Sequence, residues 1–332
     1  MSLAATLVDS FGRVHTNLRI SVTDRCNIRC FYCMPEEGVQ FKPRHEILSF
    51  EEIERFVRVA AGLGVRELRL TGGEPLVRAD LTTLVARLAA VPGIDDLAMT
   101  TNGMLLPQHA AALKQAGLQR LNISLDAMCE ATFERIARRR GLDQVLAGIA
   151  EAQRQGFRKI RLNAVAIRGI TEHEIVPLAR FARQQGLELR FIEFMPLDAE
   201  HRWQDDQVLP GDEIRARLEA EFGPLAPAAR PDPSQPAVDY RFVDGSVVGF
   251  INPVSEPFCR DCNRLRITAE GQVRNCLFST VEWDARAVMR GGGSDEQLAD
   301  LVRTCVGAKK PGHGIDEPGF LRPGRAMFQI GG

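Results

Sequence analysis

The chain contains 332 residues, of which 26% are charged and 45% are hydrophobic, and its formal net charge is −1. This composition is ordinary for a globular protein, and the near-zero charge excludes a global basic field that would attract nucleic acid or a membrane surface. No stretch approaches a membrane span in length, and the opening MSLAATLVDSFGR lacks the basic and apolar regions of a signal peptide. We therefore expect a cytoplasmic protein that contacts neither membrane nor nucleic acid and holds any anionic ligand with a local cluster of cations.

Short apolar runs alternate with helical patterns through the first two thirds of the chain. The apolar runs predict strands at 18–22, 67–70, 96–100, 120–125, 159–167 and 187–194. Helical periodicity separates them at 50–63, 80–90, 107–116, 141–155 and 173–185, and Ser49 is the expected N-cap of the first helix. Strands that alternate with helices pair in parallel through right-handed crossovers. We therefore predict an α/β fold, a partial (βα)6 barrel of the TIM type.

Polar motifs follow four of these strands. TGGEP comes after the second strand, TTNG after the third, SLDA after the fourth and EFMP after the sixth. Any one of them is explained by turn formation, because Gly, Asn and Pro are common in turns. Four polar strand ends in register instead indicate an active site at the C-terminal face of the barrel.

The pattern changes near residue 224. The segment GPLAPAARPDPSQPAVD is rich in proline and alanine and is interpreted as a linker or a surface loop. Beyond it we expect strands at 240–243, 247–251, 265–268 and 272–274, then helices near 283–290 and 295–305. The predicted division is a barrel domain, residues 1–223, and a smaller α+β domain, residues 224–332, that closes the barrel mouth.

Six of the eight cysteines form two tight groups: Cys26, Cys30 and Cys33, and Cys259, Cys262 and Cys276. The other two, Cys129 and Cys305, stand alone and are expected to be small buried residues. The first group, CNIRCFYCMP, has Cys-x3-Cys-x2-Cys spacing directly after a strand. Zinc takes four protein ligands, or three and a water, whereas an iron–sulfur cube on three cysteines leaves one iron open.

The first triplet and the TGGEP motif resemble those of the radical S-adenosylmethionine (radical SAM) enzymes. The resemblance implies that the open iron of a [4Fe-4S] cluster binds S-adenosylmethionine, and that one electron splits this cofactor to a 5′-deoxyadenosyl radical. It also implies which residues contact S-adenosylmethionine, namely Tyr32, Gly73, Ser124 and Met195. Taken alone, Tyr32 and Met195 are also typical packing residues.

The second triplet, FCRDCNRLRITAEGQVRNC, together with LRISVTDRCN, RFIEFMP and the final IGG, resembles the GTP 3′,8-cyclase family of radical SAM enzymes. The resemblance implies a second [4Fe-4S] cluster with an open iron beside the purine of GTP. The implied GTP-binding residues are Arg19, Arg69, Thr100, Arg161, Arg264, Leu265 and Arg266. The implied catalytic residues are Arg19, Arg264, Arg266, Gly331 and Gly332. Without the resemblance, a structural zinc site is the alternative for this triplet and a frayed end is the alternative for the two glycines.

The implied reaction belongs to molybdenum cofactor biosynthesis. The adenosyl radical abstracts the 3′ hydrogen of GTP, and the ribose carbon radical attacks C8 of guanine. One electron and one proton then convert the cyclised aminyl radical to (8S)-3′,8-cyclo-7,8-dihydroguanosine 5′-triphosphate. The implied partners are GTP, an external one-electron donor and the next enzyme, cyclic pyranopterin monophosphate synthase; the chain is a monomer or a homodimer. Two positions depart from the family pattern: Arg161 replaces a common lysine, and Glu67 stands where a basic residue is common.

Two other functions compete with this interpretation. A radical SAM enzyme of peptide maturation also carries auxiliary clusters, although usually with more C-terminal cysteines than the three of the second group. An iron–sulfur or zinc protein without catalytic activity is the rival from a different class.

Overall fold

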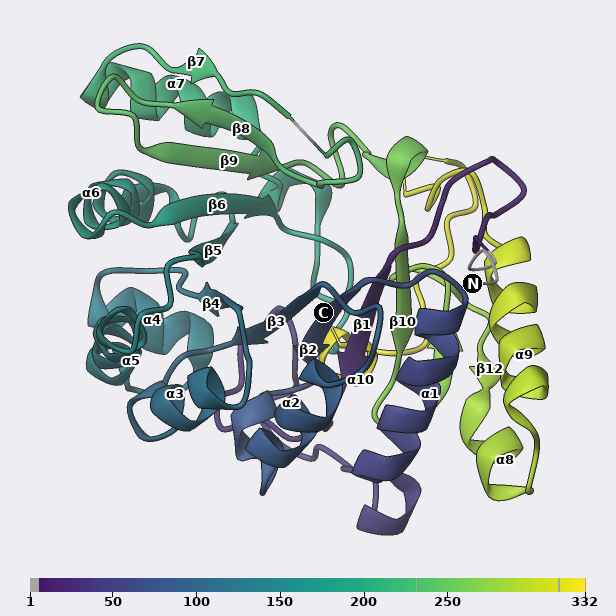
Figure 1. Ribbon diagram of the computed structural model, residues 1–332. Coiled ribbons are helices and arrows are strands. Elements are labelled where there is room, and N and C mark those ends of the chain that lie inside the picture. The colour runs from purple at the N-terminus through teal and green to yellow at the C-terminus, as the bar shows by residue number, and fades with distance from the viewer. Residues whose placement is uncertain (1–5, 231, 316, 332) are drawn as a thin grey trace.

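The computed structural model describes residues 6–230, 232–315 and 317–331. Its centre is a run of six parallel strands that are neighbours in chain order. These strands are β1 Asn17–Ser21, β2 Glu67–Thr71, β3 Asp96–Thr101, β4 Arg120–Ser124, β5 Ile160–Ala166 and β6 Glu188–Glu193. All six expected strands are confirmed to within one residue at each end, and so is the α/β class with a parallel sheet (Figure 1).

Helices join successive strands and pack on one face of the sheet (Figure 1). They are α1 Phe50–Gly62, α2 Leu81–Ala89, α3 Leu106–Gln115, α4 Glu130–Ala137, α5 Leu142–Arg154 and α6 Ile175–Gln185. Ser49 is confirmed as the N-cap of α1: its side chain accepts from the Glu52 N–H, and the Glu52 carboxylate accepts from the Ser49 N–H. Helix α4 was not expected, because its 8 residues are too few to establish a periodicity.

The strands beyond residue 224 extend this sheet at both of its edges. Strand β9 Val247–Ile251 pairs in parallel with β6, and β10 Arg264–Ile267 pairs in parallel with β1. Antiparallel strands complete the edges: β8 Val238–Arg241 and β7 Ala226–Pro227 beside β9, and β11 Gln272–Arg274 and β12 Trp283–Asp284 beside β10. The C-terminal strands therefore belong to the same twelve-stranded sheet as the barrel strands. The division at residue 223 stays a prediction.

The remaining helices are α7 Gly211–Phe222, α8 Ala285–Arg290, α9 Asp295–Gly307 and α10 Met327–Ile330. Helices α8 and α9 were expected, and α9 packs against α1 (Figure 1). Helix α7 was not expected, because Ile214 and Leu218 are its only fully buried large side chains and its apolar stripe is weak. The proline-rich segment is more than a surface loop: it contains β7, and Asp232 and Gln235 line the cavity described below.

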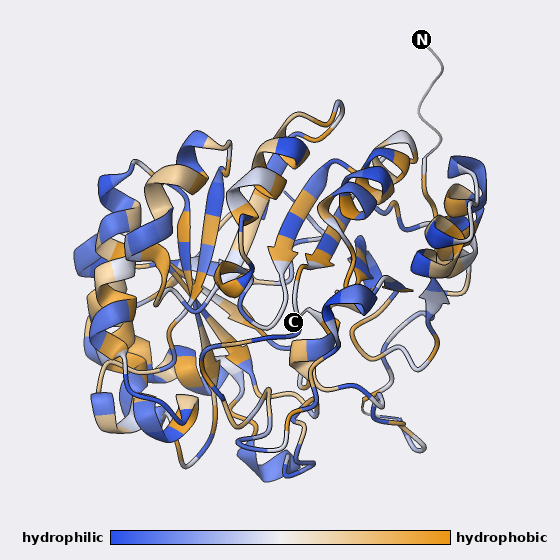
Figure 2. Cartoon of the chain, turned by 90° about the horizontal axis from the view of Figure 1, so that it is seen from below, coloured by the Kyte–Doolittle hydropathy of each residue, from blue (hydrophilic) through white to orange (hydrophobic). Residues whose placement is uncertain are grey.

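Side chains of the strands alternate between an apolar core and a polar interior. In β1 and β2 the leucines and the isoleucine are buried, while Arg19 and Arg69 are half-buried on the other face. Figure 2 shows this alternation as orange and blue bands along the strands. The apolar face packs against the helices and leaves a polar interior to hold the site. No helix among the described residues is long and apolar enough to cross a membrane.

Candidate active site

One cavity of about 520 Å³ brings the two cysteine triplets together. All six triplet cysteines line it. The first triplet follows the C-terminal end of β1, whereas Cys262 precedes β10 and Cys276 follows β11. Strand β10 is parallel to β1, with Arg264 opposite Asn17, and β11 runs antiparallel to β10. The register therefore places the first triplet at the C-terminal edge of the parallel strands and the second triplet at their N-terminal edge.

The first triplet lies on a tight turn in which the N–H groups of Cys33 and Met34 both donate to the Cys30 carbonyl at 2.9 Å. Burial raises the pKa of Cys26 to about 11, and the Glu74 carboxylate adds to the shift. Burial also raises the pKa of Cys30 and of Cys33. Because their surroundings favour the thiol form, these cysteines need a bound metal to become thiolate ligands.

The four residues expected to contact S-adenosylmethionine all line this cavity: Tyr32, Gly73, Ser124 and Met195. The Tyr32 hydroxyl donates to Asp126 Oδ2 at 2.6 Å, and Asp126 Oδ1 accepts from the Val165 N–H at 2.8 Å. Glu74 of TGGEP accepts from Thr101 Oγ1 and from the Asn102 N–H, each at 2.7 Å, and burial raises the Glu74 pKa to about 7. Buried carboxylates thus join the strand-end motifs to one another, while the cofactor contacts stay a prediction.

The two glycines of TGGEP are required by the chain itself. A Cβ on Gly73 would lie 2.3 Å from the Arg25 carbonyl oxygen, and one on Gly72 would lie 2.5 Å from the Thr23 carbonyl oxygen. Gly72 also has φ +153°. The motif after β2 therefore packs directly against the backbone that leads into the first triplet, which any larger residue would displace.

The second triplet lies among cations. Arg264 Nε and Lys309 Nζ each donate to Cys262 Sγ at 3.4 Å. Burial alone would raise the pKa of Cys262, but the positive charges of Arg264 and Lys309 outweigh it and lower the pKa to about 6. This sulfur is therefore suited to be a thiolate ligand.

The donor chemistry of both triplets fits an iron–sulfur cube better than zinc. No three His, Cys, Asp or Glu side chains among the described residues converge closely enough to hold a single metal ion. A tetrahedral zinc site needs such convergence, whereas a cube binds three separated cysteine thiolates at different irons.

Three arginines lie side by side on neighbouring strands between the triplets. Arg19 of β1 is in direct register with Arg266 of β10 on one side and with Arg69 of β2 on the other. All three line the cavity, and in the described part of the chain none forms an ion pair with a carboxylate. Among the described residues, the buried Nε atoms of Arg19 and Arg69 have no hydrogen-bond partner. Burial lowers the pKa of Arg19 and of Arg69, and the neighbouring arginines lower both further.

Like charges in direct register destabilise a sheet, and a buried cation without a partner is costly. These three residues, Arg19, Arg69 and Arg266, are called the arginine row. Their buried positive charges favour the binding of an anion in the cavity. Burial lowers the pKa of Arg266 to about 9, with Arg264 adding to the shift, and its Nη1 donates to the Gly331 carbonyl at 2.6 Å. An anionic ligand would reverse these shifts because it stabilises the charged form of each guanidinium.

Two family models match this chain: "Radical SAM superfamily" over residues 20–182 and "Molybdenum Cofactor Synthesis C" over residues 187–315. A curated GTP 3′,8-cyclase from Rhodopirellula baltica is 53% identical over 98% of this chain and 92% of its own length. Another, from Mycobacterium sp. (strain KMS), is 47% identical over 100% of this chain and 95% of its own length. The chain belongs to the GTP 3′,8-cyclase family. The resemblance inferred from the motifs is thereby confirmed.

Solved structures confirm the fold. Streptococcus suis SuiB bound to S-adenosylmethionine has a TM-score of 0.62 at 14% identity, over 87% of this chain and 68% of that chain. Methylornithine synthase (PylB) has a TM-score of 0.50 at 18% identity, over 64% of this chain and 63% of that chain. At these identities the likeness extends to the fold alone. The two family models meet between residues 182 and 187, at the end of α6 and just before β6, and therefore before the predicted boundary at 223.

Further cations complete the interior of this member of the GTP 3′,8-cyclase family. Arg161 lines the cavity and pairs with Glu188 at 2.5 Å. Arg190, which sequence reasoning missed, also lines it; burial lowers its pKa to about 10, and its Nη2 donates to Gln235 Oε1 at 3.1 Å. Its position in β6, in register with Asn163 of β5, was the available signal. Glu67 lines the cavity too and accepts from Asn17 Nδ2 at 2.9 Å.

The other family positions are placed as follows. Thr100 and Arg264 line the cavity, and Arg264 stacks over the Phe258 ring at 4.8 Å. The Leu265 side chain lies in the apolar core, so any contact with substrate would come from its backbone. Gly331 has φ +73°, and a Cβ there would lie 2.5 Å from Thr71 Oγ1. The prediction for Gly332 lies outside the described residues.

Of the two solitary cysteines, Cys305 is buried as expected. The expectation for Cys129 is wrong, because this residue is exposed at the N-cap of α4. It had no hydrophobic periodicity around it that would have required burial.

Proposed function

We propose that this chain is a radical SAM lyase that converts GTP to (8S)-3′,8-cyclo-7,8-dihydroguanosine 5′-triphosphate in molybdenum cofactor biosynthesis. The observation that carries the proposal is the arginine row, which lines the same cavity as both cysteine triplets. A triphosphate brings several negative charges, and arginine matches phosphate oxygens with a planar fork of donors. Full-length similarity to curated GTP 3′,8-cyclases supports GTP as the nucleotide.

The triphosphate is assigned to the cations on the inner face of β2, β5 and β6. Arg69 forms no ion pair with any described carboxylate, while Arg161 and Arg190 pair with Glu188 and Asp239. Glu67 lies on the same face of β2 as Arg69 and accepts a hydrogen bond from Asn17 of β1, so the net positive charge of this subsite is smaller than the number of arginines indicates. The pairing carboxylates hold the guanidiniums in place before the substrate arrives.

Each triplet is assigned one [4Fe-4S] cluster. Cys26, Cys30 and Cys33 hold the first, beside the residues assigned to S-adenosylmethionine; Cys259, Cys262 and Cys276 hold the second, beside Arg264. Bound at the first triplet, the cluster and S-adenosylmethionine supply the radical that removes the 3′ hydrogen of GTP. Ribose must therefore face the first triplet and guanine the second, an orientation that Arg69, Arg161 and Arg190 fix by holding the phosphates.

The protein's own groups hold the reacting part of the substrate. Arg19 and Arg266 are adjacent in register, and Arg266 also fixes the Gly331 carbonyl. These buried guanidiniums stabilise negative charge and hydrogen-bond nearby oxygens and nitrogens of the substrate. Arg19, Arg264, Arg266 and the glycine tail are the groups we assign to proton delivery after C8 is attacked.

The wider arrangement is proposed on the same basis. The sheet forms a partial barrel, and the C-terminal part, residues 224–332, closes its mouth. The conversion needs two electrons, one for cleavage of S-adenosylmethionine and one for reduction of the cyclised radical, and an external one-electron donor would supply both. The product passes to cyclic pyranopterin monophosphate synthase. The chain acts in the cytoplasm as a monomer or a homodimer.

The test is anaerobic incubation of reconstituted protein with GTP, S-adenosylmethionine and a reductant, followed by chromatography of nucleosides and nucleotides. We expect 5′-deoxyadenosine and the cyclised triphosphate to appear together. Iron and sulfide near eight atoms each per chain are expected for two cubes. Formation of 5′-deoxyadenosine without consumption of GTP would contradict the proposal, as would zinc without sulfide at the second triplet.

A further inference from the structure

Lys309 is a buried lysine behind the second triplet. It is 5% exposed, and its Nζ donates to Cys262 Sγ at 3.4 Å and to the Arg264 carbonyl at 3.0 Å. Within the described ranges, no carboxylate lies within ion-pair distance of this ammonium group. A buried ammonium group needs a compensating negative charge. Of its two acceptors, only the Cys262 sulfur can carry one.

Lys309 is absent from the residues that line the cavity, whereas Cys262 and Arg264 line it. It therefore reaches the cavity only through the residues that it holds. The Lys309 ammonium group donates hydrogen bonds both to the Cys262 sulfur and to the carbonyl of Arg264, the first residue of β10. It therefore fixes the position of the sulfur relative to β10.

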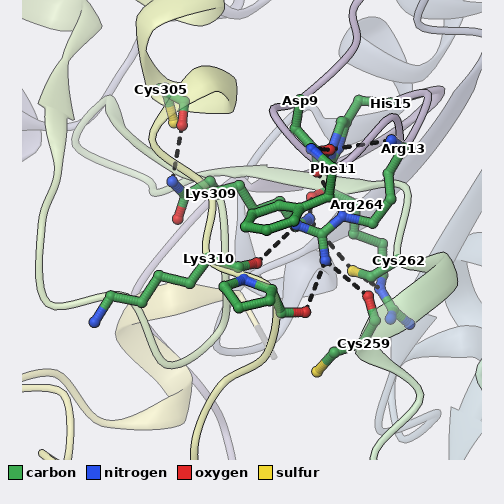
Figure 3. Close-up of polar contacts among 12 residues, drawn as sticks. Asp9, Phe11, Arg13, His15, Cys259, Cys262, Arg264, Cys305, Lys309 and Lys310 are labelled. Atoms are coloured by element: carbon green, nitrogen blue, oxygen red, sulfur yellow. Dashed lines mark hydrogen bonds and ion pairs between the residues drawn. The ribbon is translucent and has the colours of Figure 1, made fainter.

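A buried network near the N-terminus keeps the segment that carries Lys309 in place. The Arg13 guanidinium donates to the Cys259 carbonyl at 2.9 Å, to the Lys310 carbonyl at 2.7 Å and to the Pro311 carbonyl at 3.0 Å. Figure 3 shows Arg13 between the turn of the second triplet and the segment after α9. Asp9 in turn pairs with Arg13 Nε at 2.5 Å and with His15 Nε2 at 3.1 Å.

These contacts join three parts of the chain that are far apart in sequence. The Arg13 guanidinium binds the backbone close to Cys262 and the backbone next to Lys309. The fold therefore fixes the contact between Lys309 and Cys262. The neighbouring Lys310 is exposed, and its side chain points away from Cys262 in Figure 3. It is the natural comparison for Lys309.

We propose that Lys309 is a positioning residue that holds the Cys262 thiolate and raises the reduction potential of the second cluster. The proposal rests on the second cluster assigned under the proposed function. Hydrogen bonds to cluster sulfurs and nearby positive charge stabilise the reduced cluster, which carries one more negative charge than the oxidised one. Lys309 supplies both to a single ligand.

The experiment measures the potential of the second cluster alone. In a background in which Cys26, Cys30 and Cys33 are replaced by serine, the cluster is reconstituted and titrated by EPR-monitored potentiometry. Lys309→Met keeps the apolar stem and removes the charge and the donors. We expect its reduced-to-oxidised ratio at a fixed potential to fall about tenfold, equivalent to about 59 mV for one electron.

Lys310→Met is the matched control and should titrate like the parent. Lys309→Arg keeps a charged donor and should recover most of the shift, which a purely structural role for Lys309 would not require. An unchanged potential in Lys309→Met overturns the proposal. If Lys309→Met does not retain the cluster, Lys309→Gln, which keeps a neutral donor, decides by the same titration: an unchanged potential overturns the proposal and a lowered one supports it.

The two proposals fail in different ways. If the serine background holds no iron and sulfide at all, the second cluster is wrong and the proposed function falls with it. If that background holds a cluster whose potential does not respond to Lys309, the proposed function stands and only the role of Lys309 is lost.

Discussion

The two cysteine triplets lie in opposite electrostatic surroundings although they line one cavity. Burial raises the pKa of the thiols of the first triplet, and the carboxylates of Glu74 and Asp126 raise those of Cys26 and Cys30 further. In the second triplet, burial raises the pKa of Cys259, but Arg264 and Lys309 lower the pKa of Cys262 to about 6 in spite of burial. The first site is therefore neutral to acidic, while the second is cationic.

This difference matches the ligands assigned to each end. S-adenosylmethionine carries a positive sulfonium, which the carboxylates near the first triplet tolerate. GTP is strongly anionic, and the arginine row lies on β10, β1 and β2, between the two triplets. A field that changes sign along one cavity can orient two ligands of opposite charge head to head.

The largest expected effect separates the roles of the two triplets. Cys30→Ser should abolish both cleavage of S-adenosylmethionine and conversion of GTP, because the first cluster starts the reaction. Cys262→Ser should abolish conversion of GTP while the protein still forms 5′-deoxyadenosine in the presence of reductant. Chromatographic measurement of 5′-deoxyadenosine and GTP in both variants checks this. Equal loss of 5′-deoxyadenosine in the two variants would show that cleavage of S-adenosylmethionine does not depend on the first triplet alone.

Removing a cation of the arginine row should affect GTP but not S-adenosylmethionine. For Arg69→Met we expect GTP to bind about ten- to a hundredfold more weakly, the usual loss for a charge-assisted hydrogen bond. Equilibrium binding of both ligands to the reconstituted protein measures the effect. Arg58→Met removes an exposed arginine of α1 that pairs with Glu54, and should bind both ligands as the parent does. Weaker binding of S-adenosylmethionine by Arg69→Met would contradict the assignment of Arg69 to GTP alone.

A change confined to the first end is Gly73→Ala. The added methyl group would lie 2.3 Å from the Arg25 carbonyl and must displace the segment that leads to Cys26. Overpacking of this kind costs about 1–3 kcal/mol of unfolding free energy, and we expect the first cluster to be lost more readily than the second. Gly62→Ala, at the end of α1 with open space around it, should be neutral or slightly stabilising. Denaturant unfolding and iron content of the two variants provide the comparison.

The smallest expected effect is a loss of folding stability in acid that arises from His15, near the second triplet. Burial, with the charge of Lys309 adding to it, lowers the pKa of His15 from 6.5 to about 4. The folded chain therefore binds a proton at His15 less tightly than the unfolded chain does. The neutral His15 contributes its full stabilisation to the folded state above pH 6.5, and this stabilisation is lost as the pH falls toward 4. Between pH 7.5 and 5.5 the loss should be about 1–2 kcal/mol.

Denaturant unfolding of the parent and of His15→Gln at both pH values measures this loss. The glutamine variant should lack most of the pH dependence, whereas His45→Gln, at an exposed position, should keep it. The same pH dependence in His15→Gln and the parent would assign the acid sensitivity to other groups.

Much of this molecule could be predicted from local patterns in the sequence. The strands, the cap at Ser49 and the spacing of Cys26, Cys30 and Cys33 depend on residues close together in the chain. Hydrophobic periodicity and ligand spacing are local properties, and for this reason the α/β class, the order of β1 to β6 and the family could be inferred before the structure. Helices α4 and α7 were missed because one is short and the other buries few apolar residues.

Only the tertiary structure decided how distant segments meet. Strand β10 pairs with β1 although about 250 residues separate them, and this pairing aligns Arg266 with Arg19 and places the second triplet at the edge opposite the first. Arg190 and Lys309 gain their surroundings from the same long-range packing. The sequence by itself determined where the strands lie and which side chains alternate between the two faces of each strand. Their register across the sheet, and therefore the charge that each end of the cavity presents, was set by pairings that no local pattern encodes.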